Sequence, residues 1–148
     1  FGRETPIPRL NAWYGDEGRT YSYSGIRLDP LPWTPLLKAL RDQAGSAAGV
    51  EFNSVLANLY RTGSDSVGWH ADDEPELGSK PVIASLSFGA TRSLQMRRRD
   101  GTHRAVVDLH DGDLMVMRGF TQALWMHRVP KVSREVGPRV SLTFRSVL

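Results

Sequence analysis

The chain has 148 residues, of which 40% are hydrophobic, and a formal net charge of +3, which is typical of one folded domain rather than of a disordered segment. It contains no cysteine, so disulfides, thiolate zinc sites and cysteine nucleophiles are excluded. No apolar run approaches the length of a membrane span, and no signal peptide is visible. The absence of cysteine fits a reducing compartment, and we expect an intracellular protein, cytoplasmic in a bacterium or nuclear in a eukaryote. We also expect a monomer.

The N-terminal third of the sequence predicts one helix that follows extended segments. Residues 1–11 contain two prolines and no periodicity, and we interpret them as an extended arm. Residues 20–25 alternate tyrosine with small polar residues and end in glycine, which is typical of a strand. A helix then begins with Thr34 as N-cap and Pro35 at its first position. Residues 45–49 end this helix.

From residue 52 onward the sequence predicts short strands. Turns at Asp100-Gly101 and Asp111-Gly112 separate successive strands. The strands are expected at residues 52–60, from 67, and at 81–88, 93–98, 105–109, 114–117, 124–129 and 139–145. Many short strands with few helices favour a β-sandwich or jelly roll in one domain.

The stretch 68–74 (Gly-Trp-His-Ala-Asp-Asp-Glu) places a histidine and a carboxylate two residues apart. Side chains at positions i and i+2 of a strand share a face, so His70 and Asp72 can point at one ion. His127 offers a third ligand from far along the chain. Two histidines and one carboxylate with open positions favour non-haem Fe(II) and O₂ chemistry. The spacing by itself favours a surface pair, because it occurs by chance in many proteins.

Three further side chains have simpler interpretations. His103 and His110 lie beside predicted turns, and we expect both to face solvent. Trp69 lies between Gly68 and His70, on the opposite face from the candidate ligand, and we expect it in the core.

Residues 139–145 (Arg-Val-Ser-Leu-Thr-Phe-Arg) alternate polar and apolar side chains without a break. The apolar face is expected to pack into a core. The polar face consists of Arg139, Ser141, Thr143 and Arg145. Because the arginine fork matches carboxylate geometry, this face predicts the wall of a dicarboxylate pocket, with a solvated edge strand as the alternative. Asn58 and Tyr60 repeat the two-residue spacing and add neutral donors. A metal triad beside such a wall implies 2-oxoglutarate as cosubstrate.

In this ordered combination the chain resembles an AlkB-type Fe(II)/2-oxoglutarate-dependent dioxygenase of the nucleic-acid dealkylation family, in its DNA-repair branch. The matching segments are residues 8–9, 13–16, 21–25, 58–60, 70–74, 85–89, 127 and 139–145. Ser141 stands where many relatives carry asparagine. The resemblance implies a mainly β domain over residues 1–148, a double-stranded β-helix (jelly roll) with a flanking helix. Residues 1–30 would form a substrate-recognition region and residues 50–148 the jelly-roll core.

The resemblance also implies three groups of functional residues. The catalytic group would comprise the iron ligands His70, Asp72 and His127 together with Arg145. The residues that hold 2-oxoglutarate would be Asn58, Tyr60, Arg139, Thr143 and Arg145. The substrate-binding residues would be Tyr21, Ser22, Tyr23, Asp73 and Glu74, since tyrosines stack on bases and carboxylates suit cationic alkylated bases. The alternatives are two core aromatics and an acidic solvent loop.

The implied activity is oxidative dealkylation of N-alkylated bases such as N1-methyladenine and N3-methylcytosine in DNA. It would use Fe(II), O₂ and 2-oxoglutarate, release formaldehyde, succinate and CO₂, and repair DNA alkylation damage. The partner would be alkylated DNA that is single-stranded or carries a flipped-out base. Phosphate contacts are expected from Arg97, Arg98, Arg99, Arg104, Lys131 and Arg134, unless these form a solvated face. The same chemistry on RNA or a protein side chain, and a non-catalytic nucleic-acid-binding relic, remain as alternatives.

Overall fold

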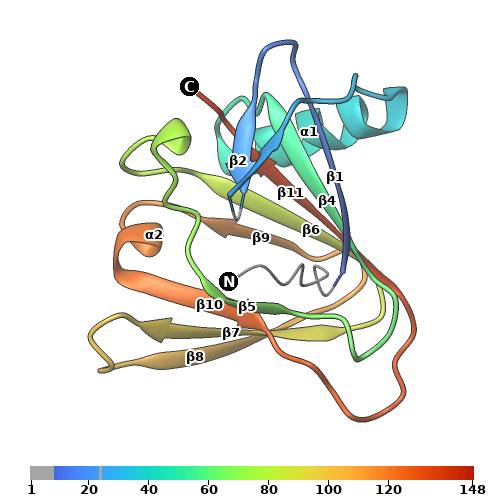
Figure 1. The fold of residues 1–148 in the computed structure, drawn as a ribbon, viewed down its shortest axis with the longest axis vertical. Helices are drawn as coiled ribbons and strands as arrows, with labels where there is room; N and C mark the ends of the chain where they lie inside the picture. The colour runs from blue at the N-terminus through green and yellow to red at the C-terminus, as the bar shows by residue number, and fades with distance from the viewer. Residues whose placement is uncertain (1–8, 24) are drawn as a thin grey trace.

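The computed structural model describes residues 9–23 and 25–148 and contains two facing antiparallel sheets (Figure 1). The five-stranded sheet contains, in spatial order, β1 (Leu10–Gly15), β4 (Ser54–Tyr60), β11 (Arg139–Arg145), β6 (Ile83–Gly89) and β9 (Leu114–Met117). The four-stranded sheet contains β5 (Val67–His70), β10 (Trp125–Val129), β7 (Arg92–Arg98) and β8 (Arg104–Leu109). A separate hairpin pairs β2 (Tyr21–Tyr23) with β3 (Ile26–Leu28). The predicted mainly β jelly roll is confirmed.

Helix α1 (Pro35–Ala48) begins through the N-cap that the sequence predicts and ends at Gly49, the last residue of the predicted 45–49 ending. The hydroxyl of Thr34 accepts a hydrogen bond from the backbone N–H of Leu37 at 3.2 Å, which satisfies one of the free donors of the first turn. Gly49 adopts a φ of 74° and donates its N–H to the carbonyl of Gly45 at 2.8 Å. A left-handed residue of this kind ends a helix most easily when it is glycine.

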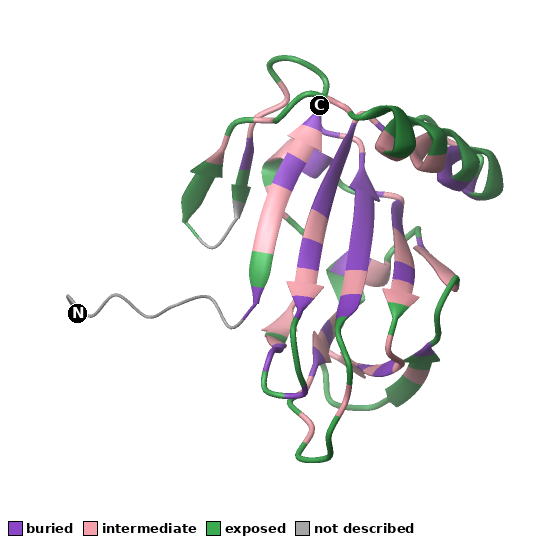
Figure 2. Ribbon diagram, turned by 90° about the vertical axis from the view of Figure 1, so that its right-hand side faces the viewer, coloured by how far each residue is buried: buried purple, intermediate pink, exposed green. Residues whose placement is uncertain are grey.

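Strand β11 is the centre of the five-stranded sheet because it is hydrogen-bonded to β4 on one edge and to β6 on the other. Its apolar residues Leu142 and Phe144 pack in a core cluster with Ala44 and Ala48 of α1. The alternating polar residues therefore face the other sheet. Figure 2 shows that buried residues concentrate along these central strands. The regular alternation of β11 thus separates a structural face from a polar inner face.

The structure differs from the sequence prediction at the N-terminus and near residue 121. Leu10 and Asn11, interpreted as part of an arm, belong to β1 and pair with β4, while residues 1–8 lie outside the described part of the chain. The alternation in β1 is weak, so its strand conformation depends on this pairing. The short helix α2 (Thr121–Leu124) and the 3₁₀ helix η1 (Pro75–Leu77) were not predicted, because a single turn is too short to show helical periodicity.

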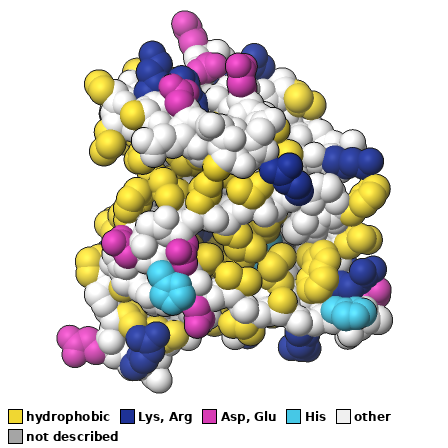
Figure 3. Space-filling view, turned by 180° about the vertical axis from the view of Figure 1, so that it is seen from behind, with side chains coloured by type: hydrophobic (Ala, Val, Ile, Leu, Met, Phe, Trp, Pro, Cys, Tyr) yellow, Lys and Arg dark blue, Asp and Glu magenta, His cyan; other side chains and the backbone are white. Residues whose placement is uncertain are grey.

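Apolar side chains also gather in the hollow between the two halves of the molecule, as the view from behind shows (Figure 3). Leu94 and Leu109 of the four-stranded sheet and Met115 and Met117 of β9 line the pocket between the sheets. Within the described residues, none of the helices is long and apolar enough to cross a membrane. The expected location and oligomeric state stay predictions.

Candidate metal centre and cosubstrate pocket

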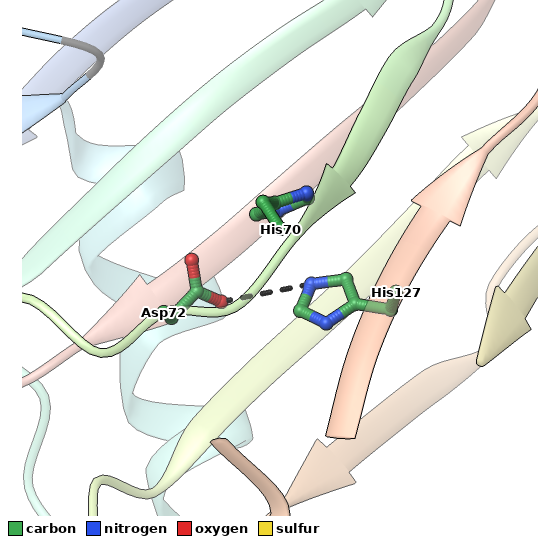
Figure 4. A group of neighbouring side chains, drawn as sticks. All are labelled: His70, Asp72 and His127. Carbon is green, nitrogen blue, oxygen red and sulfur yellow. Dashed lines mark ion pairs between the residues drawn. The ribbon is translucent and has the colours of Figure 1, made fainter. Parts of the chain in front are cut away.

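Three side chains that lie far apart in the sequence converge between the sheets (Figure 4). His70 is the last residue of β5, Asp72 follows in the next loop, and His127 lies in the middle of β10. Their candidate ligand atoms all lie within 4.8 Å of one another. The register pairs His70 with His127 across the two strands, so both imidazoles share the inner face. Asp72 lies beyond the end of the strand, so the shared-face argument explains only part of this geometry.

Both imidazoles can offer a ring nitrogen to a metal. The Nδ1–H of His70 donates to the carbonyl of Gly68 at 2.8 Å, which leaves the Nε2 lone pair free. Burial and, next, the neighbouring His70 lower the pKa of His127 to about 4. His127 is therefore neutral near pH 7, and its Nε2 lies 3.9 Å from the Oδ2 of Asp72. A neutral imidazole is the form that binds a metal.

The carboxylate of Asp72 is held by a buried ion pair. The Nη2 of Arg145 donates to its Oδ1 at 3.0 Å, and both residues are at most 3% exposed. Burial alone would raise the pKa of Asp72, but Arg145 and the two histidines outweigh it and lower that pKa. Burial likewise opposes the charge of Arg145, and Asp72 reverses the effect and raises the pKa of Arg145. The pair is therefore fully charged at neutral pH.

The loop that carries Asp72 is fixed by contacts that the sequence did not reveal. The side-chain oxygen of Gln122 accepts a hydrogen bond from the backbone N–H of Asp72 at 2.9 Å, and Gln122 is only 2% exposed. The Nη2 of Arg99 donates both to Asp73 at 2.9 Å and to the carbonyl of Gln122 at 3.0 Å. Gln122 belongs to the short helix α2, which has no sequence signature. These bonds tie the loop after β5 to α2.

The polar face of β11 forms the other wall of the same pocket, as the sequence predicts. Arg139 is 1% exposed, and its Nη2 donates to the hydroxyl of Ser87 at 2.9 Å. Its Nε and Nη1 have no hydrogen-bond partner within the described residues. A buried guanidinium with unused donors is costly unless an anion completes it. Ser141 and Thr143, buried beside it, have their hydroxyls 3.4 Å apart.

Strand β4 contributes the neutral side chains that the spacing predicts. Asn58 and Tyr60 are buried and line the pocket, and Arg139 lies over the ring of Tyr60 at 5.1 Å. Burial raises the pKa of Tyr60, so its phenol stays a neutral donor. Arg9 also lines the pocket and donates from Nε to the Oδ1 of Asn58 at 3.1 Å. Arg9 lies in a segment that matches the family, and the sequence predicts no role for it.

The predicted base-stacking role of Tyr21 requires a correction. Tyr21 is 0% exposed and stacks on Trp13, with ring centroids 4.7 Å apart. Arg145 lies over the same tyrosine at 5.3 Å. Tyr21 is therefore a core residue that supports Arg145, because β1 and the β2–β3 hairpin close over it. Ser22 is exposed, and the side chain of Tyr23 lies outside the described part of the structure.

The two acidic residues after Asp72 point in different directions. Asp73 is exposed and paired with Arg99. Glu74 is half-buried, and burial raises its pKa, while an interaction with Tyr21 lowers it.

The three side chains outside the site have mixed outcomes. His103 and His110 are exposed, as predicted. Trp69 was expected in the core, and this is wrong: it lies on the outer face of the four-stranded sheet, where Arg97 and Arg128 cover it.

The residues present fit an iron ion and a 2-oxoglutarate molecule. His70, Asp72 and His127 supply the deprotonated nitrogen and oxygen donors of the two-histidine, one-carboxylate triad that is typical of non-haem Fe(II). The unused donors of Arg139 supply a fork for a carboxylate. Both features line one pocket, so the pocket offers a metal site and a carboxylate-binding fork together.

Comparison with known proteins agrees with this geometry. The family model described as the 2OG-Fe(II) oxygenase superfamily matches residues 3–145, and the chain belongs to this superfamily. Fe(II), 2-oxoglutarate and O₂ are therefore the cofactor and cosubstrates that its family implies. The predicted identification as an Fe(II)/2-oxoglutarate-dependent dioxygenase is confirmed at the level of the superfamily.

The chain is similar to individual AlkB-type proteins. It is 50% identical over 150 residues to human "Alpha-ketoglutarate-dependent dioxygenase alkB homolog 3", covering 95% of this chain and 52% of the relative. It is 42% identical over 156 residues to human "DNA oxidative demethylase ALKBH2", covering all of this chain and 60% of the relative. The chain thus spans about half the length of the first relative. The solved structure titled "The structure of OsALKBH1" has a TM-score of 0.69 at 21% identity, covering 98% of this chain and 82% of that one, and it supports the fold alone.

Proposed function

We propose that this protein oxidatively removes alkyl groups from the ring nitrogens of nucleic-acid bases, with alkylated DNA as its principal substrate. The observation that carries the proposal is one pocket in which His70, Asp72 and His127 face the unused donors of Arg139. The relatives named as a DNA oxidative demethylase and an alkB homolog dioxygenase support the substrate class.

The residues of the pocket divide the work. Arg139, with the neutral donors Asn58 and Tyr60, binds and orients the far carboxylate of 2-oxoglutarate. His70, Asp72 and His127 hold Fe(II). Arg145 keeps Asp72 ionised and fixes its direction through the 3.0 Å bond. Precise placement of the cosubstrate is the main contribution of the protein, since the oxidation itself belongs to the metal.

The bound iron, with O₂ and 2-oxoglutarate, supplies the oxidising power for the reaction. One oxygen atom enters the C–H bond of the alkyl group, and the other enters 2-oxoglutarate, which loses CO₂ and becomes succinate. The hydroxymethyl group on nitrogen then leaves as formaldehyde, and the nitrogen keeps the bonding electrons and restores the base. A methylated ring nitrogen lies on the pairing edge, so the base is bound single-stranded or flipped out of a duplex.

We place substrate recognition in residues 1–30, with the jelly-roll core at residues 50–148. Asp73 and Glu74 lie directly after the metal ligand, where a carboxylate attracts a cationic alkylated base. Ser22 is exposed on the β2–β3 hairpin, and we assign it to the substrate-binding group as well. N1-methyladenine and N3-methylcytosine are the lesions that fit this charge. Repair of DNA alkylation damage inside the cell is the role that follows.

One incubation tests the proposal. The protein is mixed under air with Fe(II), ascorbate, 2-oxoglutarate and a single-stranded oligodeoxynucleotide that carries one 3-methylcytosine. Mass spectrometry follows the methyl group, and succinate is quantified alongside. We expect loss of the methyl mass that requires both iron and 2-oxoglutarate. Asp108→Ala, an exposed carboxylate on β8, is the matched control for Asp72→Ala, which should be inactive.

Three other outcomes would contradict the proposal in distinct ways. Succinate without demethylation would mean that the substrate is not alkylated DNA, and the same assay on methylated RNA or a peptide would then identify the alternative. Turnover by Asp72→Ala equal to the wild type would show that the assignment of His70, Asp72 and His127 as iron ligands is wrong. No product from folded, metal-loaded protein would favour a non-catalytic nucleic-acid-binding relic.

A further inference from the structure

The outer face of the four-stranded sheet carries a cluster of arginines around one tryptophan. The guanidinium of Arg97 lies 4.3 Å from the ring centroid of Trp69, and that of Arg128 lies 4.6 Å from the same ring. His127, the neighbour of Arg128, points into the metal site, so Arg128 points to the opposite side. The cluster therefore lies on the reverse side of the sheet that holds the metal ligands.

A third arginine extends this cluster toward the edge of the sheet. Arg104 of β8 is the register partner of Arg97 of β7, and directly opposite residues of an antiparallel pair lie on the same face. Like charges directly opposite each other destabilise a sheet. We call Trp69, Arg97, Arg104 and Arg128 the arginine face. It keeps three positive charges together at a cost to the fold, which is typical of a surface that binds an anion.

Within the described part of the chain, acidic side chains do not neutralise the arginine face. Among the described residues, Arg97, Arg104 and Arg128 form none of the ion pairs. The nearest acidic neighbour on the same face of β8 is Asp108, four residues from Arg104, which is about 13 Å along a strand. Asp108 already accepts a hydrogen bond from Ser93 at 2.6 Å. Arg128 donates to Gln95 at 2.7 Å, which orients it without neutralising it.

The three arginines at 97–99 were all predicted to contact phosphate, but they have different partners in the structure. Arg99 is bonded to Asp73 and to the carbonyl of Gln122, and Arg98 is paired with Asp100 at 3.3 Å. Only Arg97 joins the arginine face. The positive charge that is available to a partner is therefore a row across the strands and not the loop of the hairpin.

The row starts beside the metal site. Trp69 lies on β5, the edge strand of its sheet, next to the ligand His70. The arginines follow on β10, β7 and β8 in the spatial order of the sheet. Strands lie about 4.8 Å apart, so the row extends roughly 15 Å from the edge. A chain that leaves the pocket over the edge of β5 meets these side chains in succession.

We propose that the arginine face binds the phosphates of a single-stranded nucleic acid whose target base occupies the pocket. The inference rests on the proposed function. Arginines in a row give charge complementarity to a polyanion, and the strand passes from the pocket over the β5 edge onto this face. An acidic peptide would meet the same charges, but the continuity of the row with the metal site favours the strand whose base is being repaired.

Binding of two oligonucleotides tests the proposal. Fluorescence anisotropy is measured without 2-oxoglutarate, so that no turnover occurs, on a 15-nucleotide and a 3-nucleotide strand with a central 3-methylcytosine. The variant is Arg97→Ala/Arg104→Ala. The matched control is Lys38→Ala/Arg41→Ala, which removes the same charge from α1 on the other sheet. Melting temperatures verify folding, and loss of the like-charge pair should leave the first variant at least as stable as the wild type.

We expect the first variant to bind the 15-nucleotide strand at least tenfold more weakly, with a salt dependence smaller by about 1.4 logarithmic units per decade. Its affinity for the 3-nucleotide strand and its turnover of that strand should stay within twofold of the wild type. The control should change the affinity for the long strand by less than threefold.

Equal losses in both variants would reduce the effect to net charge and overturn the proposal. If Arg97→Ala/Arg104→Ala binds the long strand as the wild type does and still demethylates it, the proposed role of the arginine face is wrong. The proposed function would not be affected. Loss of binding to a poly-glutamate peptide alone would assign the face to an acidic protein partner instead. Wild-type protein that neither binds nor demethylates either strand would overturn both inferences.

Discussion

The two walls of the pocket are held in place by different means. The cosubstrate wall, β11, is hydrogen-bonded along both edges, from Arg139 paired with Tyr60 on one side and with Gly89 on the other. The metal ligand Asp72 lies past the end of an edge strand, and single side-chain contacts from Gln122 and Arg145 fix it.

This difference predicts which half of the site is easier to damage. A backbone ladder tolerates the loss of any one side chain, since each residue of β11 is positioned by its neighbours. The loop of Asp72 has no such ladder, so each contact matters on its own. Substitutions of Asp72 or of its partner Arg145, at the end of β11, should therefore reduce metal binding and stability together. Substitution of Arg139, at the other end of β11, should affect the cosubstrate alone.

The largest effect is expected from Asp72→Ala. The substitution removes a ligand and leaves the buried Arg145 without its partner, so we expect turnover at background and a loss of about 3–5 kcal/mol in the free energy of unfolding. Urea unfolding of the metal-free protein measures this loss. The double variant Asp72→Ala/Arg145→Met should recover part of the stability and none of the activity. Additive losses in the two substitutions would contradict the ion pair.

A pH dependence of stability should come next in size. In the metal-free protein the folded pKa of His127 is about 4, against an ordinary value of 6.5. Between these values the unfolded chain binds a proton that the folded chain does not, so stability falls as the pH falls from 6.5 to 4. The contribution is about 3 kcal/mol. Unfolding in chelator measures it, and His127→Gln should lack this part of the slope. Parallel slopes in both proteins would show that His127 is not the cause.

Arg139→Lys probes the cosubstrate wall. Lysine cannot reproduce the fork, so we expect the KM for 2-oxoglutarate to rise by roughly 10- to 100-fold. Metal affinity and folding should stay close to the wild type, because β11 keeps its ladder. Ser87→Ala, which removes only the hydroxyl that accepts from Arg139, is the matched control and should have a smaller effect. A fall in metal affinity equal to the effect on KM would contradict the separation of the two walls.

The smallest effect is expected from Gln122→Ala. The change leaves the backbone N–H of Asp72 without its acceptor, at a cost of about 1–2 kcal/mol. Calorimetric titration with Mn²⁺ should show weaker binding, whereas the KM for 2-oxoglutarate stays unchanged once metal is saturating. Gln95→Ala removes a similar amide from the outer face, where it bonds Arg128, and should leave metal affinity intact. Equal metal affinity in the two variants would show that Gln122 does not position Asp72 for metal binding.

The sequence by itself determined the parts of the site that follow local rules. The alternation of residues 139–145 separated a core face from a pocket face, and the structure has the same strand bounds and the same two faces. The capping residues Thr34 and Pro35 located the start of α1. His70, Asp72 and His127 were identifiable because few side-chain types bind Fe(II). In each case the information lies in residue type and short spacing.

Only the tertiary structure decided the parts that depend on pairing between distant segments. Tyr21 has a strand pattern compatible with a stacking surface, yet β1 and the β2–β3 hairpin bury it against Trp13. Gln122 supports Asp72 because a helix of one turn lies beside that loop. Arg97, Arg104 and Arg128 share one face because three strands pair in a particular register. Local sequence does not encode these contacts, since they exist only once the strands have assembled.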